Sequence, residues 1–321
     1  MRSKKTVLVC GATGFIGRNI CETLSKNKEY RVVGIYNKRP KYESPEIDWI
    51  KADLTIKSEV DKALEGVDII VQAAATTSGS KDIVLRPYIH VTDNAVMNSL
   101  IFRAAFEQEV QHVLFFSCTV MLESSPEPQT EEAYDANTEL HPRYFGVGHT
   151  KLYIEKMCDF YSKLGETKYT AVRHTNIYGP HDKFDLEKSH VFGASITKVL
   201  SAEEGSSISV WGTGEEERDL LYVDDLTDFV LRAINKQKSK YSLYNCGYGS
   251  AISIRDLVRK IISISNKKIN IEHDLSQPTI MTSLSLNCNK AKKELGWQPD
   301  TSLDKGIEQT ISWWKKNVEE R

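Results

Sequence analysis

The sequence has no long hydrophobic run, since the apolar stretches of its 321 residues fall well short of the roughly 20 residues that cross a bilayer. The first residues lead into a short apolar segment that ends at glycines, which is too brief for the core of a signal peptide. The sequence therefore predicts a cytoplasmic protein that does not bind membranes.

No charge of one sign dominates, because 42 Lys and Arg residues face 44 Asp and Glu residues and the isoelectric point is near 6.5. A nucleic-acid-binding protein normally carries a clear basic excess, so we expect no nucleic-acid partner. The six cysteines show neither a CxxC pair nor the spacing of metal ligands. This pattern predicts reduced thiols in a cytoplasmic protein and no metal site.

Short β-branched runs alternate with amphipathic stretches in the first half of the chain, which is typical of parallel βαβ units. Together they predict an α/β protein with a Rossmann-like, doubly wound parallel sheet of six strands. This rhythm breaks after residue 176, where a smaller α/β lobe is expected. The expected strands are 6–10, 31–36, 47–51, 68–73, 112–117, 169–174 and 208–211, and the expected helices are 16–27, 58–64, 93–107, 150–164, 191–202, 224–234, 254–263 and 290–295.

A glycine-rich turn directly follows the first expected strand and opens a helix. Glycines there permit a tight turn and let backbone N–H groups approach a pyrophosphate at the positive end of the helix. This position and the GxxGxxG spacing predict a dinucleotide cofactor, although glycines that merely close the turn are the alternative. The segments after the third and fourth strands are expected to line the same site. The expected cofactor residues are Gly11, Thr13, Gly14, Phe15, Ile16, Gly17, Asp53, Leu54, Ala73, Ala74 and Ala75.

The segment after the second expected strand discriminates between the two nicotinamide cofactors. NAD enzymes usually place an acidic residue there, whereas this chain has Asn37, Lys38 and Arg39. Basic side chains would neutralise the 2′-phosphate of NADP. The segment therefore favours NADP(H), while NAD(H) and a merely solvated charged loop stay open.

These residues, with Ser117, Lys151 and the run Asn176-Ile177-Tyr178-Gly179-Pro180-His181-Asp182, resemble the extended short-chain dehydrogenase/reductase family, and within it the GDP-L-fucose synthases. The resemblance implies an NADP(H)-binding domain at 1–175, with a return near 219–246, and a nucleotide-sugar-binding lobe at 176–321. It also implies a GDP-sugar substrate and a homodimer formed through helices 93–107 and 150–164. Asn94 would shape the active-site helix beside the cofactor. The substrate residues it implies are Asn176, His190, Val191, Val210, Trp211 and Arg218.

The chemistry of that family uses a tyrosine four residues before a lysine, so that both side chains share one face of a helix. Here Lys151 is present, but Val147 stands at the tyrosine position. Tyr144 lies seven residues before Lys151, which places it about 4–5 Å too far along the helix axis, so that it would reach the site only through an unusual loop before the helix. We therefore expect Ser117 and Lys151 to work with a different proton donor.

A second departure concerns epimerisation, for which the GDP-L-fucose synthases use a cysteine two residues after the serine, opposite a histidine. Thr119 takes the cysteine position, and we expect His181 to be the histidine. Cys118 is one residue early and is expected on the opposite side of the strand. A threonine hydroxyl is too weak a base to deprotonate carbon, so we expect no 3,5-epimerisation.

The missing tyrosine leaves the source of the proton open. His181 is the first candidate, because an imidazole titrates near neutrality, and water held by Ser117 and Thr119 is another. His149 is expected to point away from Lys151, since the two residues are only two positions apart on a helix.

The predicted function is therefore NADP(H)-dependent reduction of a GDP-linked 4-keto-6-deoxy sugar without 3,5-epimerisation. Two alternatives stay open at this point: an epimerase or dehydratase that recycles a bound cofactor, and a catalytically silent NADP(H)-binding regulatory protein.

Overall fold

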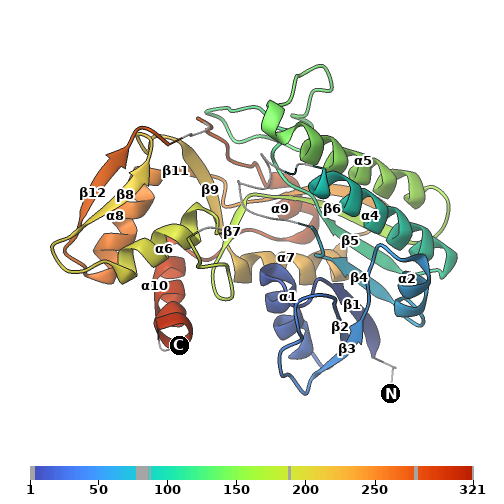
Figure 1. Cartoon of the computed structure of the whole chain (residues 1–321). Coiled ribbons are helices and arrows are strands. Elements are labelled where there is room, and N and C mark those ends of the chain that lie inside the picture. Colours follow the sequence, from blue (N-terminus) through green and yellow to red (C-terminus); the bar gives the residue numbers. More distant parts are fainter. Residues whose placement is uncertain (1–3, 77–85, 87, 187–188, 278–280, 320–321) are drawn as a thin grey trace.

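A seven-stranded parallel sheet forms the centre of the computed structural model, which describes residues 4–76, 86, 88–186, 189–277 and 281–319 (Figure 1). The strands are ordered β10-β6-β5-β4-β1-β2-β3. Their bounds are β1 (Lys5–Cys10), β2 (Tyr30–Tyr36), β3 (Ile47–Lys51), β4 (Ile69–Gln72), β5 (His112–Phe116), β6 (Lys168–His174) and β10 (Tyr241–Cys246).

Helices cover both faces of this sheet. On one face lie α1 (Phe15–Ser25), α7 (Val223–Lys236) and α9 (Asn289–Leu295), and on the other α2 (Lys57–Ala63), α4 (Ile89–Glu107) and α5 (Phe145–Ser162) (Figure 1). Side chains alternate between faces along a strand. In β1, Val7 and Val9 enter the core beneath α1 and α7, while Leu8 and Cys10 enter the core beneath α4 and α5.

A smaller lobe lies beside the large sheet (Figure 1). One small sheet joins β7 (Asn176–Tyr178), β9 (Glu217–Tyr222) and β11 (Ala251–Ser253), and another pairs β8 (Ser207–Trp211) with β12 (Asn270–Asp274). Three helices, α6 (Val191–Ser201), α8 (Ile254–Ser265) and α10 (Leu303–Trp314), share a third apolar core with these strands.

The predicted Rossmann-like, doubly wound sheet is confirmed, and all six strands expected in the first half form within two residues of their predicted bounds. The predicted strand number is wrong, because β10 adds a seventh strand beside β6. The start of α5 is also corrected from residue 150 to Phe145, and α10 was not predicted. Among the described residues, no helix combines the length and apolar character needed to cross a bilayer.

Candidate cofactor and active site

The glycine turn is built as a close backbone contact. Gly11 has a φ of +73°, and a Cβ there would lie 2.7 Å from the Cα of Ala74. A Cβ on Gly17 would collide with the carbonyl oxygen of Gly11. Because Gly14 caps α1 without a side-chain hydrogen bond, the first N–H groups of the helix stay open to an anion. These features fit a dinucleotide pyrophosphate.

Basic residues gather beside this turn. Arg39 donates a hydrogen bond from Nη1 to the carbonyl oxygen of Thr13 at 2.9 Å, which ties the loop after β2 to the glycine turn. The pKa of Asp53 is lowered mainly by hydrogen bonds from Thr55, and further by Asn37 and Lys38. The structure thus brings the loop after β2 and the end of β3 together, as a site for the adenosine half of the cofactor requires.

The segment after β4 is held by Asn94. Its side-chain oxygen accepts from Thr76 N at 3.0 Å, and its amide group donates to Thr76 O at 3.1 Å and His90 O at 2.8 Å. Asn94 is buried. It therefore fixes the chain that follows Ala73–Ala75, the segment that the prediction places beside the cofactor. Leu54 is likewise buried in the core beneath α4.

Lys151 reaches the carboxyl end of β5 from α5. Its Nζ donates to the carbonyl oxygen of Phe116 at 2.7 Å and lies 4.7 Å from the ring centre of Phe115. Burial lowers the pKa of Lys151, which Cys118 and Glu155 partly oppose. A lysine with a depressed pKa releases a proton more readily than a solvated one.

Ser117 belongs to a buried polar network rather than to an open site. Its Oγ donates to Glu155 Oε1 at 2.6 Å, and Arg173 holds the same carboxylate with bonds of 3.0 and 2.7 Å. Ser117 is only 1% exposed. The expectation that Ser117 works beside Lys151 at the reacting centre is corrected for this geometry, because its single hydroxyl proton is already given to Glu155.

Val147 stands one turn before Lys151 on α5 and is half-buried. Tyr144 ends the short 3₁₀ turn η1 (Pro142–Tyr144) and lies close enough to Arg218 to interact with its charge. His149 is exposed and packs its ring 4.5 Å from that of Phe145, in agreement with the expectation that it points away from Lys151.

The structure places His181 away from Lys151, against helices α1 and α10. His181 lies 3.5 Å from Glu22 of α1 and 4.9 Å, ring to ring, from Trp313 of α10. The prediction that His181 faces the reacting centre is therefore corrected, because its contacts are with α1 and α10. By contrast, His174 at the end of β6 feels the charge of both Lys151 and His190. Sequence reasoning missed His174, although its place directly before Thr175-Asn176 at a strand end was a usable signal.

Thr119 and Cys118 follow β5, which ends at Phe116. Strand alternation therefore does not apply to Cys118, and the expectation that it lies on the opposite side of a strand is wrong. Burial raises the pKa of its thiol, while the nearby Lys151 lowers it. Thr119 is half-buried, and its carbonyl oxygen accepts from Leu122 N at 2.9 Å.

The residues expected to bind a substrate lie in the smaller lobe. Asn176 on β7 donates to Asp219 O at 3.3 Å, and Arg218 on β9 donates to Thr282 Oγ1 at 2.5 Å. Trp211, at the end of β8, is 48% exposed, so its ring is available to a ligand. The prediction that the side chains of Val210 and Val191 contact a substrate is corrected. Val210 is buried in the core of the smaller lobe, and Val191 packs against that core. His190, the residue before α6, is exposed.

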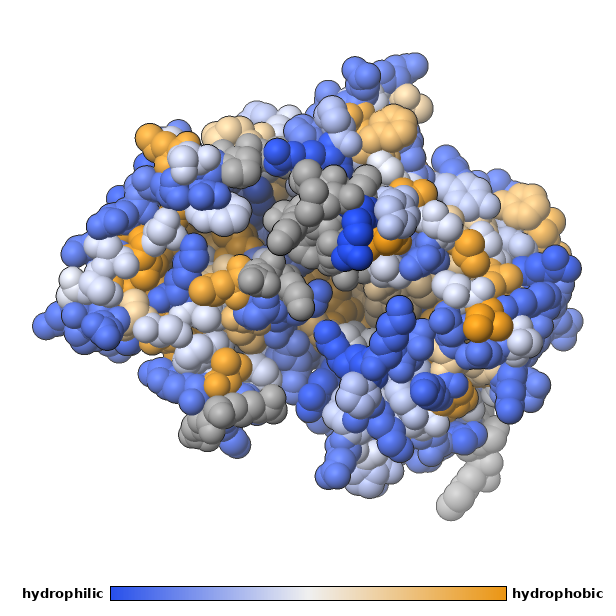
Figure 2. Space-filling model, viewed as in Figure 1, coloured by the Kyte–Doolittle hydropathy of each residue, from blue (hydrophilic) through white to orange (hydrophobic). Residues whose placement is uncertain are grey.

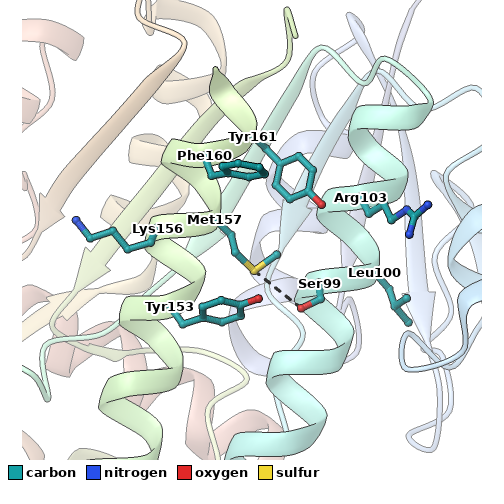
Figure 3. A pocket seen from close by; sticks show the side chains of 8 residues that line it. All are labelled: Ser99, Leu100, Arg103, Tyr153, Lys156, Met157, Phe160 and Tyr161. Carbon is teal, nitrogen blue, oxygen red and sulfur yellow. Dashed lines mark hydrogen bonds between the residues drawn. The ribbon is translucent and has the colours of Figure 1, made fainter. Parts of the chain in front are cut away.

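A groove of about 510 Å³ runs between the outer sides of α4 and α5. Figure 3 shows Tyr153, Met157 and Tyr161 of α5 pointing toward α4, where Ser99 Oγ lies 3.9 Å from the Met157 sulfur. In Figure 2 this side of the molecule shows hydrophobic side chains among hydrophilic ones. Several apolar side chains on these helices are exposed: Val96, Tyr153 and Phe160.

The described part of the chain holds no group of three or more His, Cys, Asp or Glu side chains placed to bind a metal ion. Its six cysteines are free thiols.

The chain matches the NAD dependent epimerase/dehydratase family over residues 7–247, and it belongs to that family. This is an enzyme class built on the dinucleotide-binding sheet described above.

Particular relatives narrow the comparison. The chain is 29% identical over 319 residues to a GDP-L-fucose synthase from Sinorhizobium fredii, covering 98% of this chain and 96% of the relative. It is 26% identical over 313 residues to a GDP-L-colitose synthase from Yersinia pseudotuberculosis, covering 96% and 97%. In fold it is similar to a UDP-glucose 4-epimerase from Thermotoga maritima, with a TM-score of 0.86 at 22% identity over 98% of this chain and 99% of that one.

Proposed function

We propose that this protein is a nucleotide-sugar oxidoreductase that uses NADP(H) to reduce a GDP-linked 4-keto-6-deoxy sugar. The observation that carries the proposal is full-length similarity to a GDP-L-fucose synthase and a GDP-L-colitose synthase, in a chain that keeps Lys151 at the end of β5. A further relative, 25% identical over 97% of this chain, is a dTDP-4-dehydro-6-deoxy-D-allose reductase. That name supports reduction of a ketosugar.

Residues of the large sheet would bind the cofactor, and residues of the smaller lobe would bind the substrate. The glycine turn at Gly11–Gly17 and the basic loop at Arg39 would hold the dinucleotide, which when bound supplies a hydride. Arg218 and Trp211 would hold the nucleoside diphosphate of the sugar. Lys151 would bind the ribose and supply positive charge beside the reacting oxygen, because its ammonium has two N–H groups beyond the one given to Phe116.

NADP(H) is proposed over NAD(H) because the loop after β2 is basic. Lys38, Arg39 and Arg18 are cationic, and an anionic 2′-phosphate would be stabilised among them. Arg18 currently pairs with Glu22 at 2.8 Å and lies over the ring of Tyr42. Its position at the start of α1 allows it to contribute to the same anion site.

Reduction without 3,5-epimerisation is proposed because no strong carbon base stands at position 119. Thr119 replaces the expected cysteine, and the neighbouring thiol of Cys118 has its pKa raised by burial. A thiol is a base only as its thiolate. Solvent deuterium should therefore not enter the sugar at C3 or C5 during turnover, and NMR of product formed in D₂O checks this.

The decisive experiment incubates the protein with NADPH and a panel of GDP-, UDP-, dTDP- and CDP-linked 4-keto-6-deoxy sugars, while NADPH absorbance is followed. A reductase consumes one NADPH per product molecule, and a GDP-sugar should react best. Lys151→Met is the matched inactive control. Product without net NADPH loss would instead indicate an epimerase or dehydratase that recycles its cofactor, and tight binding with no product would indicate a silent NADP(H)-binding protein.

The chain is also proposed to act as a homodimer through the outer faces of α4 and α5. The exposed apolar side chains Val96, Tyr153 and Phe160 support this, since such groups on neighbouring helices are typical of a helix-bundle interface. A cytoplasmic location is proposed as well, and fractionation of cells expressing the tagged chain tests it.

A further inference from the structure

Arg218, on β9, is a partly buried arginine without a carboxylate partner. Among the described residues its guanidinium forms no ion pair, whereas the buried guanidinium of Arg173 is paired with Glu155 at 2.7 Å. The carboxylate of the neighbouring Glu217 accepts instead from Ser283 Oγ, and adjacent side chains of a strand point to opposite faces. A partly desolvated charge is unfavourable unless an anion meets it. The position of Arg218 therefore suits an anionic ligand.

The donors of the Arg218 guanidinium are unequally used. Nη1 donates to Glu217 O at 2.7 Å and to Thr282 Oγ1 at 2.5 Å, which engages both of its hydrogens, and Thr282 O lies at a longer 3.4 Å. In the part of the chain that the structure describes, Nε and Nη2 have no hydrogen-bond partner. These two nitrogens form the edge with which a guanidinium binds two phosphate oxygens in parallel. The open edge fits a diphosphate.

Thr282 is itself held in place. Its carbonyl oxygen accepts from Glu217 N at 2.8 Å, so the main chain at position 282 is bonded to β9. The carbonyl oxygen of the next residue, Ser283, accepts from Ser125 N at 2.8 Å, which ties the same segment to the loop that follows β5. The threonine hydroxyl is therefore fixed relative to Arg218 from two sides.

We propose that Thr282 is a positioning residue for substrate binding, whose hydroxyl fixes the guanidinium of Arg218 so that the Nε–Nη2 edge receives the diphosphate of a nucleotide sugar. The inference rests on the nucleotide-sugar function proposed above and adds to it the residue that orients the phosphate contact. An arginine side chain has several rotatable bonds, and ordering it when a ligand binds weakens the binding. Because Thr282 holds the guanidinium before the ligand arrives, this ordering already takes place during folding.

Nucleotide binding in the absence of sugar and cofactor tests the role of Thr282. The full-length protein is titrated calorimetrically with GDP and with UDP, and all variants are compared with the nucleotide that the wild type binds more tightly. Thr282→Val keeps the shape of the side chain and removes the hydroxyl, so it should weaken binding about 10-fold. Thr282→Ser keeps the hydroxyl and should stay within about twofold of the wild type.

Ser283→Ala is the matched control for the segment. It removes the neighbouring hydroxyl, which contacts Glu217 rather than Arg218, and should change the nucleotide affinity by less than about twofold. The affinity for NADPH should be the same in Thr282→Val as in the wild type, which reports that the large sheet is intact. In turnover with a GDP-linked ketosugar, Thr282→Val should raise the KM for the sugar and leave kcat unchanged.

A double-substitution cycle separates positioning from general damage to the fold. Arg218→Met should weaken nucleotide binding at least about 10-fold, and adding Thr282→Val to it should weaken binding by less than about twofold more, because the threonine acts through the arginine. The inference is overturned by an unchanged affinity in Thr282→Val, by an equal loss in Ser283→Ala, or by the same loss from Thr282→Val in both backgrounds. If the wild type binds neither GDP nor UDP, the nucleotide-sugar function fails and the inference with it. If it binds one of them but reduces no ketosugar, only the reductase function fails, and the calorimetry still decides the role of Thr282.

Discussion

Replacing Arg173 by methionine should destabilise this protein far more than the loss of a surface ion pair. The Arg173 guanidinium and the Glu155 carboxylate are joined by bonds of 3.0 and 2.7 Å, and their side chains are only 3% and 5% exposed. Removing one partner of such a pair leaves a buried charge uncompensated and costs about 3–5 kcal/mol. Arg173 also donates to Glu131 O at 3.0 Å, a bond worth about 0.5–1.5 kcal/mol. We therefore expect a loss of about 3.5–6.5 kcal/mol in the free energy of unfolding.

Urea unfolding, followed by tryptophan fluorescence and far-UV circular dichroism, measures this loss. The matched control is Arg31→Met, because the Arg31–Asp48 pair has the same kind of bond, at 2.8 Å, but side chains that are 60% and 58% exposed. Its loss should stay below about 1 kcal/mol. The double change Glu155→Met with Arg173→Met should be much less harmful than Arg173→Met alone, since no charge is left buried. If Arg173→Met and Arg31→Met cost the same within 1 kcal/mol, the argument from burial is refuted.

Four further outcomes are expected. Burial lowers the pKa of His112 to about 3, below its value in the unfolded chain, so that on acidification the unfolded state is protonated first. The contribution of His112 to stability is therefore complete above about pH 6.5, and it falls by up to about 1.4 kcal/mol per pH unit below that. In urea unfolding, His112→Gln should show a flatter decline of stability toward acid pH. Arg39→Ala should weaken NADPH binding about 10-fold or more and leave NADH binding almost unchanged in calorimetry, whereas Arg31→Ala should change neither. Gly17→Ala should abolish NADPH-induced thermal stabilisation, since the new Cβ collides with the turn; retained stabilisation would contradict a pyrophosphate site there. Tyr153→Asp should convert a dimer to a monomer in light scattering without loss of helix content, and a monomeric wild type would refute the proposed interface.

Much of the sheet was predictable because its signals are local. The first strands are short, mainly apolar runs, and the glycine turn between β1 and α1 is recognisable from its GxxGxxG spacing. β10 was not predicted as a seventh strand, because Tyr241–Cys246 mixes polar and apolar residues and its partner β6 lies about 70 positions earlier in the sequence. Pairing between such distant segments leaves no local periodicity.

The active site was predicted less completely for a related reason. Lys151 and the glycine turn follow from motif and helix spacing; in the structure the turn opens α1, and Lys151 reaches the carboxyl end of β5. The positions of the histidines could not be predicted in this way. Where His174, His181 and His190 lie relative to Lys151 depends on how the loops after β6 and β7 leave the sheet. His181, with a φ of +70°, turns toward α1. Ser117 similarly depends on Glu155, which is distant in sequence and adjacent only in the folded chain.

The pairing of β10 with β6 has a consequence for any attempt to divide this enzyme. The chain leaves the large sheet after residue 174 and returns to it only at Tyr241, to bond along the whole of β6. A protein truncated before β10 would therefore expose β6 as an unpaired edge strand. Its buried residues Tyr169, Ala171 and Val172 would then lie at a solvent-exposed edge of the sheet. Exposed edges of this kind recruit strands from other molecules. The half that carries the glycine turn should thus be insoluble by itself, and soluble when residues 219–246 are supplied in the same polypeptide.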